Sequence, residues 1–405
     1  MLNVVIEGCG HGALDDIYES CKALERHAGK PIDLLICCGD YQAVRNLDDL
    51  QCMAVPDKYK ELGSFWEYYS GRKTAPYPTL FIGGNHEAIN YLRELYYGGW
   101  AAPNIYFLGY SGVVEFGGIR IGGVSGIYKS MDYLKPHFEL PPYSPSSIKS
   151  SYHVRATEIV KLSALEGGKL DVFLSHDWPC GIEKHGDVVG LLRRKKHFRE
   201  DIAGNRLGSP PSMQLLRALK PSHWFSAHLH CGFAAVVEHD DHGEGGRSTK
   251  FLGLDKCLPG RHFLQWVEFP DANGFKAFSY DAEWLAILTR APVPPSVADA
   301  GAPCVPTPPI TRPTVEDIEQ VRARFNNDLT IPDNFTITAP PHDPESASVT
   351  SGRSPTGKMP SALLENPQTV EFMRRLGIGD YAPVPEAVAN PEALDVGGLT
   401  SSEDG

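Results

Sequence analysis

Five short apolar segments of this chain each end in a histidine, an aspartate or an asparagine, and this pattern constrains the fold more than any other feature. In the sharpest case, Tyr77–Ile82 is followed by Gly83–Glu87 (GGNHE) and then by Ala88–Tyr97, whose apolar spacing predicts a helix. The two glycines let the backbone turn sharply and approach a ligand closely. Asn85 and His86 are therefore expected on a tight strand-to-helix turn, at the sheet edge where ligands bind in open α/β sheets.

The other four strand ends repeat this arrangement. They are Leu2–Glu7 before Cys9-Gly10-His11, Asp33–Cys38 before Gly39-Asp40, Asp171–Leu174 before Ser175-His176, and His223–Ala227 before His228-Leu229-His230. Helical patterns separate the strands, at Asp15–Ala28, Ala156–Leu165 and Ser212–Lys220. Strands that alternate with helices predict an α/β fold.

Length and charge narrow the function further. With 405 residues, the chain is long enough for one large catalytic domain and appended material. It has no run of eighteen apolar residues, so we expect no membrane helix. Nine cysteines without a pattern fit a reducing compartment. The formal net charge of −12 does not attract nucleic acid, so a polyanionic substrate needs metals or local basic patches.

Two stretches are candidates for contact with such a substrate. Arg193–Arg199 (RRKKHFR) is strongly basic, and it fits either a solvated loop or nuclear import signal, or a direct RNA contact. Ile127–Arg155 is a long segment, predicted to be irregular, with four prolines, five aromatic residues and four Lys or Arg against two acids. Aromatic and basic residues together suit base stacking and phosphate contact. The aromatic residues could equally hold the segment against the body of the protein.

The composition changes after about residue 290. We expect a catalytic domain at 1–290, a proline-rich linker at 291–313, a C-terminal segment at 314–380 and a disordered acidic tail at 381–405. Two helical patterns lie in the C-terminal segment, at Val315–Phe325 and Asn366–Ile378. We expect this segment to pack back on the catalytic domain, and the alternative is a free peptide that binds a partner.

The donor types at the five strand ends are those that bind Mn, Fe or Zn. Each residue alone has a structural explanation, since Asp40 could cap a helix and Asn85 could hold a turn. Because all five groups follow apolar strands, and parallel strands share an edge, the set as a whole favours a metal site.

In order and type, these residues resemble the calcineurin-like metallophosphoesterases, whose pattern is Asp-x-His, Gly-Asp, Gly-Asn-His-Asp/Glu, His and Gly-His-x-His. The resemblance implies a β-sandwich flanked by helices (αββα) and two metals bridged by one carboxylate. The chain departs from the pattern at Cys9, where most members have aspartate, and at Ala227. The cysteine is similar to one branch, the RNA lariat debranching enzymes. Further stretches that look like that branch are Gly8–Gly12, Gly39–Asn46, Glu139–Arg155, Gly208–His230, Phe251–Glu268 and Asn366–Ile378.

Residue by residue, the resemblance implies two metal pockets that share Asp40. One would consist of Cys9, His11, Asp40 and His230, and the other of Asp40, Asn85, His176 and His228. His86 would bind no metal and would act as the general acid that protonates the leaving oxygen. Segment 127–155 would be an inserted lariat-recognition loop, with candidate RNA contacts at Tyr128, Lys129, Tyr143, Lys149, Tyr152, His153 and Arg155.

The activity that the resemblance implies is hydrolysis of the 2′–5′ phosphodiester bond at the branch point of lariat RNA. A hydroxide activated by two divalent ions (Fe²⁺, Zn²⁺ or Mn²⁺) would attack the phosphorus, and excised introns would be linearised for turnover. Cys9, a softer ligand than aspartate, would favour Zn or Fe. The nucleus is the expected location, with branched RNA as partner and splicing factors as candidate partners of the C-terminal region.

Two other functions remain open at this point. A phosphoprotein phosphatase or general phosphodiesterase would share the metal site, but it gives no role to Cys9 or to the long loop. A non-catalytic scaffold for RNA processing would share the fold and lose metal ligands, whereas every expected ligand position is filled here.

Overall fold

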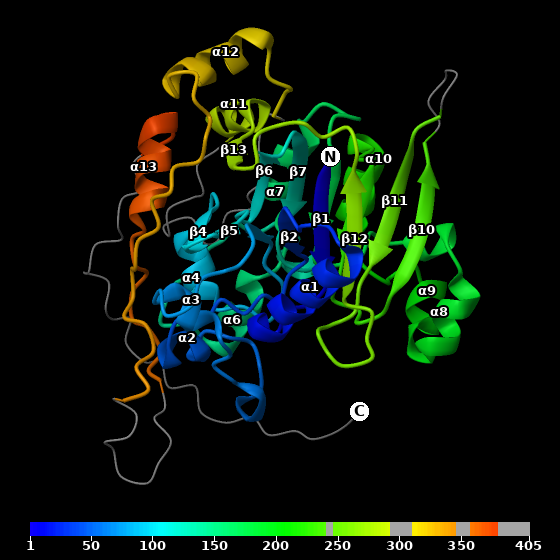
Figure 1. Ribbon diagram of the computed structural model, residues 1–405, viewed down its shortest axis with the longest axis horizontal. Coiled ribbons are helices and arrows are strands. Elements are labelled where there is room, and N and C mark those ends of the chain that lie inside the picture. The colour runs from blue at the N-terminus through cyan, green and yellow to red at the C-terminus, as the bar shows by residue number, and fades with distance from the viewer. Residues whose placement is uncertain (240–245, 292–309, 346–356, 380–405) are drawn as a thin grey trace, which may run out of the picture.

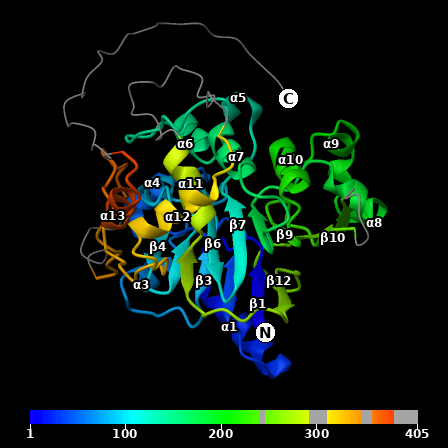
Figure 2. The same ribbon diagram turned by 90° about the horizontal axis from the view of Figure 1, so that it is seen from above.

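Two β-sheets pack face to face in a computed structural model, which describes residues 1–239, 246–291, 310–345 and 357–379 (Figure 1). Apolar side chains from both sheets, such as Ile6, Ile36, Ile121 and Leu174, meet in a core between them. Helices cover the outer face of each sheet (Figure 2). The prediction of an α/β sandwich flanked by helices is confirmed.

The first sheet has the strand order β12-β1-β2-β3-β5-β4. Four central strands run parallel, and the edge strands β12 and β4 are antiparallel to their neighbours. The strands are β1 (Leu2–Glu7), β2 (Leu34–Cys37), β3 (Thr79–Phe81), β4 (Gly99–Ala102), β5 (Ile105–Phe107) and β12 (Leu264–Phe269). The parallel pairing brings the ends of β1, β2 and β3 to one edge.

The second sheet has the order β10-β11-β9-β8-β7-β6-β13. Strands β7, β8, β9 and β11 are parallel, and the others are antiparallel to their neighbours. The strands are β6 (Ser111–Phe116), β7 (Ile119–Val124), β8 (Val172–Ser175), β9 (His223–Ser226), β10 (Phe233–Glu238), β11 (Ser248–Gly253) and β13 (Phe278–Tyr280). Here the ends of β8 and β9 lie side by side.

The helix α1 (Leu14–Ala28) illustrates how the sequence forms these elements. It buries Leu14, Ile17, Tyr18 and Cys21, which recur on one face of a helix. It ends at Gly29, whose φ of 64° is a left-handed conformation that glycine adopts without cost. The other longer helices are α7 (Ala156–Ser163), α10 (Pro210–Leu219), α11 (Ala282–Arg290), α12 (Val315–Arg324) and α13 (Pro367–Leu376).

The short elements are where the sequence prediction was incomplete. The predicted helix Ala88–Tyr97 is only α4 (Ile89–Glu94). Elements of three to seven residues are too short to show a recognisable hydrophobic pattern. They include β4, β13, α2 (Leu47–Gln51), α3 (Phe65–Tyr69), α8 (Val188–Arg194) and α9 (Arg199–Ala203). The longer α11 was not predicted either.

Segment 127–155 is more ordered than its sequence indicated. It contains two short helices, α5 (Ser130–Tyr133) and α6 (Pro145–Ser151). Ser144 caps α6 by accepting a hydrogen bond from the backbone N–H of Ser147. The two ends of the segment meet, because Ile127 N–H donates to Tyr152 O at 3.1 Å and Val154 N–H donates to Ile127 O at 2.9 Å. The segment is therefore a closed loop on the protein surface.

The C-terminal segment contacts the catalytic domain. Gln368 of α13 accepts a hydrogen bond from Trp100 N–H at 2.8 Å and donates one to Trp100 O at 2.9 Å. Figure 1 shows α13 beside β4, and α12 next to α11. Residues 292–309 of the expected linker and the expected acidic tail, 381–405, lie outside the described residues. Among the helices described, none is long and apolar enough to cross a membrane.

Candidate metal centre

The residues that follow the five predicted strands converge on one site. Cys9 and His11 follow β1, Asp40 follows β2, Asn85 follows β3, His176 follows β8, and His228 and His230 follow β9. The ligand atoms of Cys9, His11, Asp40 and His230 all lie within 4.8 Å of one another. This group has the same members as the first of the two pockets expected from the sequence.

Asp40 joins this group to a second one. His176 Nε2 lies 3.2 Å from Asp40 Oδ1, and the rings of His176 and His228 have centroids 5.0 Å apart. His176 Nδ1 lies 2.8 Å from Cys38 O, which fixes the ring proton on Nδ1 and turns the lone pair of Nε2 towards Asp40. The buried Oδ1 of Asn85 has no hydrogen-bond partner among the described residues. The second group therefore presents two unused electron-pair donors beside a carboxylate.

The backbone at these positions adopts a conformation that side chains usually avoid. The φ angles are 46° at His11, 50° at Asp40, 60° at His228 and 47° at His230. A non-glycine residue in the left-handed region is uncommon, and such residues gather at functional sites. Four of the candidate ligands therefore share a backbone conformation that is associated with functional sites.

Burial and the charge of Asp40 together control the protonation states at the centre; for His176, burial lowers the pKa, but Asp40 and other neighbouring acceptors raise it by more. Burial lowers the pKa values of His11 and His230 to about 4 and lowers the pKa of His228 as well. For Asp40, burial opposes ionisation, but the neighbouring His176 and His11 hold its pKa well below the usual range. Neutral imidazoles and an ionised carboxylate are the forms that bind a cation. Burial raises the pKa of the Cys9 thiol, so its proton must leave when a metal binds.

Comparison with known proteins identifies the family. The model for calcineurin-like phosphoesterases matches residues 2–232, and the model for the lariat debranching enzyme C-terminal domain matches residues 246–381. The chain is 49% identical over 398 residues to the lariat debranching enzyme of Homo sapiens, covering 94% of this chain and 70% of that protein. It is 48% identical over 395 residues to that of Arabidopsis thaliana, covering 95% and 88% respectively.

The chain belongs to the lariat debranching enzymes. The resemblance indicated by its motifs is thereby confirmed. Members of the metallophosphoesterase family use divalent metals, and the donors present here fit such ions. They combine imidazole nitrogens, a thiol, a bridging carboxylate and an amide oxygen without another partner.

Sequence reasoning gave no role to Glu87, although it lies within the GGNHE motif. The buried carboxylate of Glu87 accepts hydrogen bonds from the backbone N–H groups of Tyr41 at 2.8 Å, Gln42 at 2.9 Å and Gly84 at 3.0 Å. It thus joins the loop after β2 to the turn after β3. A Cβ atom on Gly84 would lie 2.2 Å from Asp40 Oδ1, so only glycine fits there.

His86 lies at the edge of the centre in this family member. Its backbone N–H donates to Asp40 Oδ1 at 2.8 Å, so the backbone and not the ring supports the carboxylate. The ring meets that of His11 edge to face, with centroids 5.1 Å apart. The side chain is half-buried, which leaves the ring in reach of a ligand at the centre.

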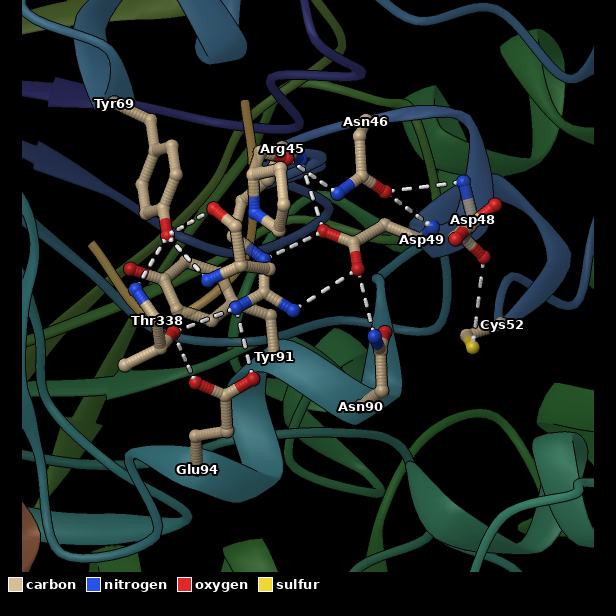
Figure 3. A network of polar contacts seen from close by, with 12 residues as sticks. Arg45, Asn46, Asp48, Asp49, Cys52, Tyr69, Asn90, Tyr91, Glu94 and Thr338 are labelled. Carbon is tan, nitrogen blue, oxygen red and sulfur yellow. Dashed lines mark hydrogen bonds and ion pairs between the residues drawn. The ribbon is translucent and has the colours of Figure 1, made fainter. Parts of the chain in front are cut away.

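A second missed element is a buried polar network around Arg45, which lies five residues after Asp40 (Figure 3). Arg45 donates to Asp49 Oδ2 at 2.8 Å and Oδ1 at 3.0 Å, to Glu94 Oε1 at 2.8 Å and to Thr338 Oγ1 at 2.9 Å. Tyr69 Oη accepts from Thr338 N–H at 2.8 Å. The network therefore fastens the C-terminal segment to the loop that carries Asp40. Arginine and aspartate at i, i+4 is a sequence signal that could have indicated the first of these pairs.

The seven candidate RNA contacts in the loop at 127–155 differ in how exposed their side chains are. Tyr143, His153 and Arg155 are 6%, 8% and 0% exposed, so the expectation that they touch RNA does not fit their burial. Arg155 instead pairs with Glu139 inside the loop. The side chains of Lys129 and Lys149 are exposed, and those of Tyr128 and Tyr152 are half-buried.

The loop is also close to the centre. Tyr128 N–H donates to Asp177 Oδ2 at 3.4 Å, and Asp177 follows His176 directly. A cavity between the loop and the turn after β3 is lined by Gly84, Tyr152 and His153, among others. A substrate held at the centre would therefore meet the loop.

Proposed function

We propose that the chain hydrolyses the 2′–5′ phosphodiester bond at the branch point of lariat RNA, as a metal-dependent phosphodiesterase. The observation that carries this proposal is the cluster of Cys9, His11, Asp40 and His230. It occurs in a chain that aligns with lariat debranching enzymes over 94% of its length. Excised introns are the branched RNAs that such an enzyme would linearise.

We propose that Cys9, His11, Asp40 and His230 hold one divalent ion and that Asp40, Asn85, His176 and His228 hold a second. When bound, two such ions would polarise the phosphoryl oxygens and lower the pKa of a water molecule. Asp40 can serve both pockets because a carboxylate has two oxygens. The contact of His176 with Cys38 O supports its proposed role as a metal ligand, because it orients the imidazole ring.

His86 is proposed to donate a proton to the 2′-oxygen of the branch nucleotide as that oxygen leaves. The backbone contact between His86 and Asp40 fixes the residue beside the centre and leaves the ring available. A positioned general acid contributes about 10²–10⁴-fold to the rate of such a reaction.

The four accessible residues of the loop are the proposed RNA contacts. They are Tyr128, Lys129, Lys149 and Tyr152. The tyrosines suit base stacking and the lysines suit phosphate contact. Tyr143, His153 and Arg155 are proposed to hold the loop in shape, because their side chains are buried within it.

Three finer assignments complete the proposal. The soft thiolate of Cys9 favours Fe²⁺ or Zn²⁺ in its pocket, and Mn²⁺ suits the O and N donors of the other. We place the protein in the nucleus, where introns are excised, and the C-terminal region is a candidate contact for splicing factors. Cell fractionation and metal analysis of the purified protein would test the first two assignments.

The experiment that tests the function is cleavage of a synthetic branched RNA by metal-reconstituted protein, beside a linear 3′–5′ RNA. Cleavage of the branch alone, with a large loss in His86→Ala, is the expected result. Equal cleavage of both RNAs would refute branch specificity. Turnover of a phosphopeptide without turnover of branched RNA would favour the phosphatase. Tight RNA binding by a protein that takes up no metal would favour the scaffold.

A further inference from the structure

A row of basic side chains projects from one side of the molecule. We name it the basic ridge, and it consists of Arg193, Arg194, Lys195, Lys196 and Arg199. It extends from the end of α8 through a 3₁₀ turn (Lys196–Phe198) to the start of α9. Figures 1 and 2 both show α8 and α9 beside β10, on the side of the protein opposite α13. Four of the five side chains are exposed, and Lys195 is half-buried.

The ridge carries positive charge that the described residues do not neutralise. None of its five cations forms an ion pair within the described ranges of the chain. Lys73 and Arg120, by contrast, each pair with two carboxylates. In a chain of net charge −12, these five cations, offset in part by Glu200 and Asp201 at the start of α9, leave a local excess of positive charge.

Stabilisation of helix α8 explains only part of the positive charge of the ridge. Cations in the last turn of a helix stabilise its dipole, which accounts for Arg193 and Arg194 at the end of α8. Lys196 and Arg199 lie beyond that helix and have no such role. Leu191 and Phe198 anchor the ridge in the core, with 0% and 6% exposure. The ridge is therefore a fixed surface, unlike a free extended peptide that serves as an import signal.

The ridge is continuous with the candidate metal centre. Arg194 Nη2 donates to Gly232 O at 2.9 Å, and Gly232 lies two residues after the candidate ligand His230. A second cation, Lys256, approaches from another side, where it forms a β-bridge with Cys9. A polyanion with one phosphate at the centre could thus continue along the ridge.

We propose that the basic ridge binds the phosphate backbone of one RNA arm that leaves the branch point. This proposal rests on the proposed function. The ridge offers cations and has no exposed Phe, Tyr or Trp, because Phe198 is buried. It therefore fits phosphates, which carry no sequence information, whereas stacking of bases would need exposed aromatic side chains. The loop at 127–155 would contact the branch, and the ridge would hold an arm beyond it.

The test compares branched RNAs with minimal arms and with each arm extended in turn by about 15 nucleotides, a length within the usual site sizes. The ridge variant is Arg193→Gln/Lys196→Gln/Arg199→Gln, which spares Arg194. In protein with an intact ridge, extension of one arm should tighten binding and steepen its dependence on salt. Loss of three phosphate contacts should reduce the slope of log K against log salt by about 2. At about 0.1 M salt, this corresponds to roughly tenfold to a hundredfold weaker binding of the long-arm RNA.

The matched control is Lys22→Gln/Arg26→Gln/Lys30→Gln, which removes the same charge from α1 and its C-terminal flank. The control should keep the benefit of the long arm. An equal loss in both variants would mean that only net charge matters, and it would overturn the proposal. If the ridge variant binds the long-arm RNA as tightly as protein with an intact ridge, the proposal is also overturned. This holds even if the variant no longer enters the nucleus, because the ridge would then serve import alone.

Binding is measured as Kd in a His86→Ala background, in which turnover does not interfere. The ridge is then tested separately from catalysis. If protein with an intact His86 cleaves none of the branched RNAs, the proposed function is refuted. The difference in Kd between long and minimal arms still decides whether the ridge holds an arm.

Discussion

Replacement of Arg45 by methionine should destabilise the protein strongly. The Arg45 side chain is 1% exposed, and its partners Asp49 and Glu94 are 2% and 1% exposed. Methionine fills a similar volume but removes all four hydrogen bonds of the guanidinium. Two buried carboxylates would then lack their cation. Breaking a buried ion pair from one side costs about 3–5 kcal/mol of the free energy of unfolding.

Thermal unfolding measures this loss. At about 2.1 cal/mol/K per residue, the unfolding entropy of the roughly 340 residues that the structure describes is about 0.7 kcal/mol/K. A loss of 3–5 kcal/mol therefore lowers Tm by about 4–7 °C. The control is Lys22→Met, which breaks an exposed pair with Glu19 and should cost less than about 1 kcal/mol.

The source of the loss is testable as well. If the cost arises from unpaired charge, the triple variant Arg45→Met/Asp49→Asn/Glu94→Gln should recover part of it, because no carboxylate remains unpaired. A Tm of Arg45→Met within about 1 °C of the control would refute the reasoning. It would mean that the carboxylates are hydrated or protonated once the arginine is gone.

Three further results are expected. Burial raises the pKa of Glu94 to about 7 from 4.5, so the native state binds more protons than the unfolded state in this range. Stability should fall as the pH rises from about 4.5 to about 7, and Glu94→Gln should flatten this dependence in urea titrations. Glu87→Ala should weaken metal binding by about 10–100-fold in metal titrations. The reason is that three backbone N–H groups lose the acceptor that positions the turns carrying Asp40 and Asn85. Unchanged metal affinity would contradict this role of Glu87. Chelation should lower Tm, since metal binds only the native state, and Asp40→Asn should remove most of that effect.

Much of the candidate site could be predicted from sequence because its signals are local. Apolar runs that end in Cys, His, Asp or Asn are visible within about ten residues, and parallel pairing brings such ends to one edge. The group of Cys9, His11, Asp40 and His230 followed from these ends together with the family resemblance. Helices such as α1, with a clear apolar face, were also predictable.

The loop at 127–155 shows where local signals fail. Its composition fitted both RNA contact and attachment to the body; the structure shows attachment for part of it, and RNA contact stays a prediction. Arg155 and Lys149 are both cations six residues apart, yet one is buried in an ion pair and the other is exposed. Exposure depends on which residues the folded chain brings alongside, and composition contains no such information.

The sequence by itself therefore determined the order of those strands and helices that are long enough to show a clear hydrophobic pattern. It also determined the chemistry of the donor side chains at the strand ends. The tertiary structure alone decided which polar and charged groups far apart in the sequence are paired. Arg45 and Thr338 are 293 positions apart and share a hydrogen bond, and Glu87 reaches across 46 positions to Tyr41. A buried polar group must find a partner to offset its lost hydration, and the partner is set by the packing of distant segments. Long-range pairing of this kind holds the loop of Asp40 in place.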